Sequence, residues 1–74
     1  MPKIPRQLKP RQVIKVLERC GFYKYGVKGS HIHYKHQDGR RTQVAVHAKA
    51  IPQGTLKAIL RQADLSTDDL LKNL

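Results

Sequence analysis

A chain of 74 residues is too short for two hydrophobic cores, so we expect a single domain over residues 1–74. Its 15 Lys and Arg against 5 Asp and Glu give a formal charge of +10, which favours polyanionic partners, nucleic acid first. An acidic protein or an anionic membrane surface would also fit that charge. The single cysteine, Cys20, excludes an intrachain disulfide. No apolar stretch resembles a secretory signal or a transmembrane helix, which predicts a cytoplasmic protein.

The first third of the chain predicts a surface arm followed by an amphipathic helix. Residues 1–8 combine two prolines with basic residues and show no apolar period, so we interpret them as a basic N-terminal arm. From Pro10, which suits the first turn of a helix, apolar residues recur at helical spacing. These residues are Val13, Val16, Leu17 and Cys20. Gly21 then provides the left-handed cap that commonly ends a helix.

Three strands are predicted next, over residues 22–28, 30–36 and 41–46. The first is rich in aromatic and β-branched residues, and Gly26 indicates a bulge or bend inside it. Gly29 precedes the second strand, where a positive φ would bring Lys28 and Ser30 close to an incoming anion. Asp38-Gly39 supplies a hairpin turn between the second and third strands.

Because side chains alternate along a strand, the second and third strands each divide into an inward and an outward set. Ser30 shares the inward face of the second strand. The residues predicted to point into the core are Ile32, Tyr34, Val44 and Val46. The residues predicted on the open side of the sheet are His31, His33, Lys35, Arg41 and Gln43, with His47 at its end. His36 is predicted to point to the core side, with no functional role.

The last third of the chain predicts two helices. One begins at Gly54-Thr55 and has its own apolar stripe, and the other is short and capped by Ser66. Asp68 and Asp69 lie in the first turn of the third helix, where the helix dipole favours acidic side chains. Two helices with one apolar stripe each can cover one face of a three-stranded antiparallel sheet. The expected fold class is therefore α+β, of order α-β-β-β-α with a short C-terminal helix.

With these elements in order, the chain resembles the HicA toxin family of bacterial toxin–antitoxin systems. The resemblance spans essentially the whole chain and rests on four short segments. They are Cys20-Gly21-Phe22, Lys28-Gly29-Ser30-His31 with Tyr34, Val44-Ala45-Val46-His47, and Gly54-Thr55-Leu56 with Ile59-Leu60. The chain departs from the family pattern at Ala45, where members often have a proline.

The resemblance implies a fold like the double-stranded RNA-binding domain, and a type II toxin that cleaves messenger RNA. It further implies His31 as the catalytic histidine and a HicB-type antitoxin protein that covers it. No cofactor is expected. Histidine suits metal-independent RNA cleavage because its unperturbed pKa of about 6.5 lies near working pH. Lys28 and Ser30 are then predicted to hold the reacting phosphate, and His33 is a candidate second proton carrier. The full set of residues predicted to bind RNA or phosphate is Lys28, Gly29, Ser30, His33, Lys35 and Arg41.

Three other interpretations of the same residues remain open. His31 and His33, with a third histidine nearby, have a spacing that can bind zinc, although no carboxylate or thiolate stands near them in the sequence. The chain can equally be a non-catalytic double-stranded RNA-binding module, in which Lys35, Arg41 and other basic residues contact the phosphate backbone. The basic face can also serve to dock an acidic protein.

Overall fold

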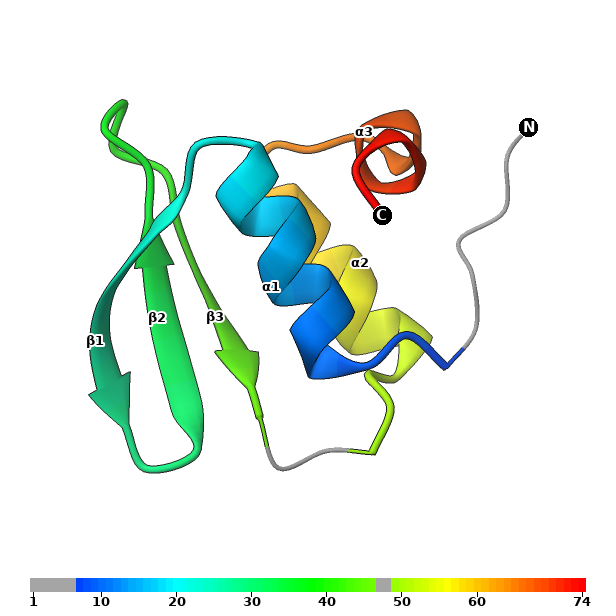
Figure 1. Ribbon diagram of the computed structural model, residues 1–74, viewed down its shortest axis with the longest axis horizontal. Helices are drawn as coiled ribbons and strands as arrows, with labels where there is room; N and C mark the ends of the chain where they lie inside the picture. The colour runs from blue at the N-terminus through cyan, green and yellow to red at the C-terminus, as the bar shows by residue number, and fades with distance from the viewer. Residues whose placement is uncertain (1–6, 47–48) are drawn as a thin grey trace.

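The computed structural model describes residues 7–46 and 49–74, so the predicted arm up to residue 6 and His47 lie outside the described residues. The elements follow the predicted order (Figure 1). They are α1 (Pro10–Arg19), β1 (Tyr23–Lys28), β2 (His31–Lys35), β3 (Arg41–Ala45), α2 (Gln53–Gln62) and α3 (Thr67–Lys72). The α-β-β-β-α order with a short C-terminal helix is thus confirmed.

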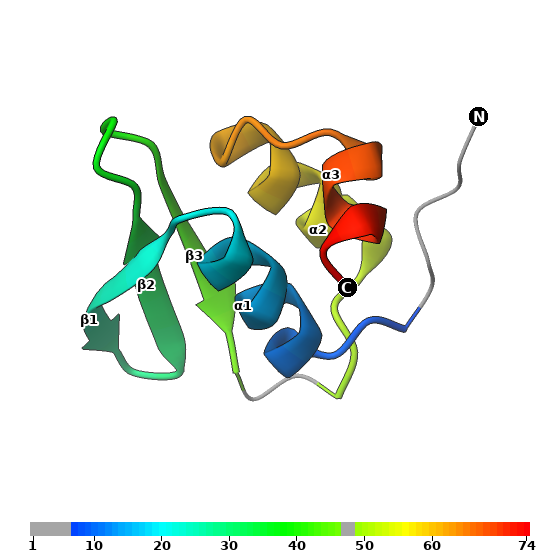
Figure 2. The same ribbon diagram turned by 45° about the horizontal axis from the view of Figure 1, so that its top comes forward.

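The three strands form an antiparallel sheet in the order β1-β2-β3, and the helices lie on one side of it (Figures 1 and 2). Both α1 and α2 pack chiefly on β3, which leaves β1 as the strand farthest from the helices. Buried apolar side chains from the helices, β2 and β3 make up one core. The side chains that are most completely buried are Leu17, Leu56, Leu70, Val13, Val16 and Val44.

Helix α1 begins and ends at the residues that its sequence indicates. Pro10 occupies its first turn, and the Lys9 N–H donates to the Oε1 of Gln12, 2.8 Å away. At the other end Gly21 has a φ of +93°, the left-handed conformation that glycine tolerates best. The chain can therefore reverse directly after the helix and place Phe22 in the core.

The alternation of side chains across the sheet is confirmed, with two corrections. Tyr34 and Val44 are buried, and Ile32 packs against the core. Val46, predicted to point into the core, is 43% exposed because it follows the end of β3 and borders an open hollow beside α1. Ser30, predicted to start the second strand on the inward face, lies instead in the turn between β1 and β2.

The bulge indicated by Gly26 lies between Lys24 and Gly26 in β1. Lys24 pairs with Tyr34, and Gly26 pairs with His33, so Tyr25 is an extra residue without a cross-strand partner. A bulge of this kind changes the side to which the next side chains point. Lys28 accordingly lies on the same side of the sheet as His31. The ring of Tyr25 lies against His33, with 5.9 Å between ring centroids.

Arg40 joins the turn after β2 to the helices, a role that the sequence did not reveal. Its Nη1 donates to the carbonyl oxygen of Ala63 at the end of α2, 2.6 Å away, and its Nε lies 2.8 Å from an Asp38 carboxylate oxygen. The guanidinium also stacks over the Phe22 ring at 5.1 Å. His36, predicted to point to the core side, packs edge-on against the same ring.

Helix α3 is capped as predicted, because the Ser66 hydroxyl accepts from the Asp69 N–H and the Asp69 carboxylate accepts from the Ser66 N–H. The Ser66 backbone N–H is the main reason that the pKa of Asp69 lies below its usual value. Arg19 at the end of α1 donates to the carbonyl oxygens of Asn73 and Leu74. These bonds hold the C-terminal segment against the first helix.

We predict that Gly21→Ala destabilises the protein more than Gly39→Ala. Both glycines have positive φ, +93° and +101°, so each substitution costs about 1 kcal/mol in backbone strain. Only at Gly21 does the added Cβ also meet a neighbour, the His36 ring nitrogen at 2.9 Å, whereas nothing lies within 4 Å of a Cβ at position 39. Urea unfolding measures the free energy of unfolding of both variants. If the two substitutions lower it equally, the predicted contact with His36 does not matter for stability.

A second prediction concerns the acid stability that Asp38 provides. The backbone N–H of Arg40, then its guanidinium and His36, hold the pKa of Asp38 below the usual value. A carboxyl with a lowered folded-state pKa stabilises the fold above its unfolded pKa and loses that effect as the pH falls through the folded value. Asp38→Asn should therefore lower the free energy of unfolding at pH 7, and the free energies of the variant and the wild type should become equal near pH 2. Urea unfolding at several pH values measures both, and a difference between the two proteins that does not change with pH would contradict the prediction.

Candidate functional site on the open face

The sheet surface that faces away from the helices, here called the open face, collects the predicted functional residues in cross-strand rows. The register places directly paired residues side by side on the same face. The three rows are Lys28, His31 and Ala45; then Gly26, His33 and Gln43; then Tyr23, Lys35 and Arg41. Five predicted residues, Lys28, His31, His33, Lys35 and Arg41, therefore share one surface.

His31 is the first residue of β2 and is exposed on this face. Lys28 is paired directly opposite it, and the two-residue turn Gly29-Ser30 connects them. Gly29 has a φ of +62°, as the tight turn requires. The carbonyl oxygen of Ser30 accepts from the Val46 N–H at 2.8 Å, which fixes the turn to the end of β3. The imidazole thus stands on a well-supported backbone, with a lysine beside it.

The other predicted residues lie farther along the strand. Residues four apart on a strand are separated by roughly 13 Å, so Lys35 and Arg41 occupy the end of the open face opposite to His31. His33 lies between these ends, half-buried beside Tyr25. Phosphates contacted by Lys35 or Arg41 would thus be different from the phosphate beside His31.

Tyr23 and Tyr25 are open-face residues that sequence reasoning missed. Each is 48% exposed. Alternation from the buried Phe22 already points both tyrosines outward, because they follow it by one and three residues. The bulge after Lys24 instead reverses the alternation for the residues that follow, and so brings Lys28 to the open face.

Two side chains with raised pKa values lie away from the open face. Burial, and next the Asp69 carboxylate, raise the pKa of the Cys20 thiol. Burial, and next Glu18, raise the pKa of the Tyr34 phenol. Both groups are therefore neutral at pH 7 and pack against the core. Among the described residues, no group of three or more His, Cys, Asp and Glu side chains is placed to hold a metal ion.

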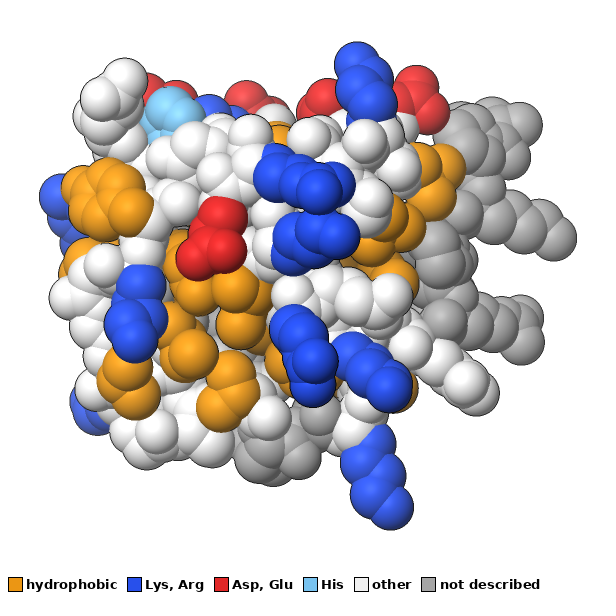
Figure 3. Space-filling view, in the orientation of Figure 1, with side chains coloured by type: hydrophobic (Ala, Val, Ile, Leu, Met, Phe, Trp, Pro, Cys, Tyr) orange, Lys and Arg blue, Asp and Glu red, His pale blue; other side chains and the backbone are white. Residues whose placement is uncertain are grey.

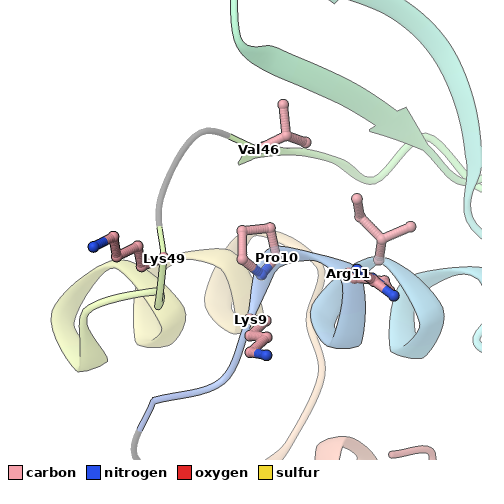
Figure 4. A pocket seen from close by; sticks show the side chains of 6 residues that line it. Lys9, Pro10, Arg11, Val46 and Lys49 are labelled. Carbon is pink, nitrogen blue, oxygen red and sulfur yellow. The ribbon is translucent and has the colours of Figure 1, made fainter.

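A separate hollow of about 300 Å³ lies between the start of α1 and the end of β3 (Figure 4). Pro10, Ile14 and the exposed Val46 form its apolar part, and Lys9, Arg11 and Lys49 complete the lining. On the face shown in Figure 3, Lys and Arg side chains are spread widely, while acidic side chains gather mainly along one edge. The basic charge is thus distributed over the surface and is not confined to the open face.

The helices on one side and the histidine-bearing open face on the other define a small α+β domain whose fold is like that of the double-stranded RNA-binding domain. A family model described as the HicA toxin of bacterial toxin–antitoxin systems matches residues 10–65. The chain belongs to the HicA toxin family, and it is the toxin member of a toxin–antitoxin pair. No curated protein matches the chain. Within the part of the chain that the structure describes, no helix is long and apolar enough to cross a membrane.

We predict that the open-face residues around His31 contribute little to stability. Because His31 and Lys28 are exposed, His31→Ala and Lys28→Ala should each change the free energy of unfolding by less than about 1 kcal/mol. Leu17→Ala, which empties a fully buried site, should cost about 2–5 kcal/mol. Thermal and urea unfolding of the three variants compare these values. A large loss for His31→Ala would mean that the residue supports the fold.

Proposed function

We propose that this toxin is a metal-independent endoribonuclease that cleaves messenger RNA, with His31 as its general acid or base. The observation that carries the proposal is the placement of an exposed imidazole at the end of the open face, directly across from Lys28 and next to the Gly29 turn. The family supports the same assignment, because HicA toxins generally act as ribonucleases.

The proposed reaction uses the RNA 2′-hydroxyl as the nucleophile. A base removes the 2′-hydroxyl proton while O2′ bonds to the adjacent phosphorus, the P–O5′ bond breaks, and an acid protonates the departing O5′. The products are a 2′,3′-cyclic phosphate and a 5′-hydroxyl. His31 supplies one of the two proton transfers, and the Lys28 ammonium stabilises the charge that grows on the phosphoryl oxygens. His33 stays a candidate for the second transfer.

Binding of the substrate depends on the positive charge. With 15 basic against 5 acidic residues, the chain attracts the phosphate backbone at long range, and this attraction weakens as salt increases. Lys35 and Arg41 are proposed to hold phosphates that lie farther from the scissile bond. Gly29 and Ser30, in the turn between β1 and β2, are proposed to contact the reacting phosphate.

The antitoxin partner is proposed to be a HicB-type protein that covers His31. A strongly basic toxin surface is complementary to an acidic partner, and opposite charge accelerates the encounter of two proteins. Because His31 is exposed at the end of the sheet, a bound partner need only cover that end to exclude RNA.

We predict that His31→Ala abolishes RNA cleavage while the variant stays folded. Lys28→Ala should slow cleavage by about 10-fold or more, because it removes a cation next to the reacting phosphate. Lys24→Ala is the matched control, since Lys24 is an exposed lysine of the same strand that pairs with Tyr34 on the covered face. Gel analysis of a labelled messenger RNA, with circular dichroism for folding, measures all three.

Two further conditions test the mechanism. Cleavage should persist in EDTA, and RNA with a 2′-deoxy nucleotide at the cleaved position should resist. If the His31→Ala variant cleaves RNA at the wild-type rate, the catalytic assignment is wrong. Retention of RNA without any cleavage by the wild-type chain would favour the non-catalytic RNA-binding module.

A further inference from the structure

A second hollow, of about 340 Å³, begins on the open face at His33 and extends past β3 to Gln62 of α2. We propose that this hollow binds one unpaired nucleobase of the RNA, with Tyr25 as the stacking residue. The inference rests on the proposed function for its ligand, RNA, and adds to it a base-binding subsite and a preference for single-stranded substrate. The residues that line the hollow are Tyr25, His33, Arg41, Thr42, Gln43 and Gln62.

The side chain of Tyr25 provides the stacking surface. Tyr25, the unpaired residue of the bulge, lies edge-on to the His33 ring, with 66° between the ring planes and 5.9 Å between the centroids. This contact orients the tyrosine ring, yet 48% of the residue stays exposed. A partly exposed aromatic ring held in one orientation beside cationic residues is the arrangement on which single-stranded nucleic acids stack their bases.

The remaining walls of the hollow are polar in a way that suits a base edge. Gln43, paired with His33 in the register, is exposed and carries both a donor and an acceptor. Toward α2, the hydroxyl of the buried Thr42 donates to Gln62 Oε1 at 2.9 Å and holds the Gln62 side chain, whose NH₂ group is a donor, beside the hollow. Arg41 adds a planar cation that can contact either a base or a phosphate. A purely apolar ligand would leave these groups unpaired.

The hollow is close enough to the proposed catalytic residue to act on the same substrate. His33 and His31 are two residues apart on one face of β2, a separation of roughly 7 Å. A base held against Tyr25 therefore belongs to a nucleotide at or near the cleaved position. A base inside an RNA duplex is paired and stacked on both sides, so it cannot enter the hollow without being extruded. The substrate should consequently be single-stranded at this position.

The experiment measures binding to 2′-O-methyl RNA, which lacks the attacking hydroxyl and so separates binding from cleavage. A fluorescein-labelled 12-nucleotide single strand of mixed sequence, and the same strand annealed to its complement, are titrated with the full chain by anisotropy. Tyr25→Ala should weaken single-strand binding roughly 5- to 150-fold, the range measured for loss of one stacked base. Tyr25→Phe should retain the affinity because it keeps the ring.

Tyr23→Ala is the matched control, because Tyr23 lies on the same strand with the same 48% exposure but does not line the hollow. It should weaken binding less than about 3-fold. Single-strand affinity within 2-fold of wild type for Tyr25→Ala, or duplex affinity as high as single-strand affinity, would overturn the inference. If Tyr25-dependent binding is found but His31→Ala still cleaves RNA, the base subsite stands and the proposed catalytic role of His31 fails.

Discussion

The two long helices cover only one face of the sheet, and the rest of the structure depends on this one-sided burial. Tyr34 is 2% exposed on the covered side of β2, whereas His31 on the other side is exposed. Burying Tyr34 and Val44 fixes the register, because a slip of one residue would send the apolar side chains to solvent and the histidines into the core. The free energy that holds the fold together therefore also determines which side chains face a ligand.

Stability and proposed function consequently reside in different residues. The interactions that join the layers involve Arg40, which reaches the end of α2, and Phe22, which carries both the Arg40 and the His36 contacts. None of these side chains lies in the three open-face rows. Substitutions at His31 can then remove chemistry while the fold persists, and substitutions around Phe22 can unfold the chain without altering the chemistry directly.

The open face combines two kinds of subsite along one strand. At one end an imidazole and a lysine stand beside a tight turn, and next to them an aromatic ring and amide groups surround a hollow. Phosphate recognition supplies affinity without sequence information, whereas a base-binding hollow can discriminate among nucleotides. A small toxin with both features can bind many messages and still prefer certain positions within them.

The sequence by itself determined the element order, the cap at Gly21, the bulge near Gly26 and the outward position of His31, because these follow from local periodicity and from backbone preferences of single residues. The family also followed from short motifs in the sequence. Tertiary structure alone decided the rest. Val46 stays exposed because it borders a hollow beside α1, and Lys28 reaches the open face because the bulge shifts the pairing of β1 against β2. Arg40 joins the turn to α2 across 23 residues of sequence. Such outcomes depend on which segments meet in space, which the pattern of a single segment does not contain.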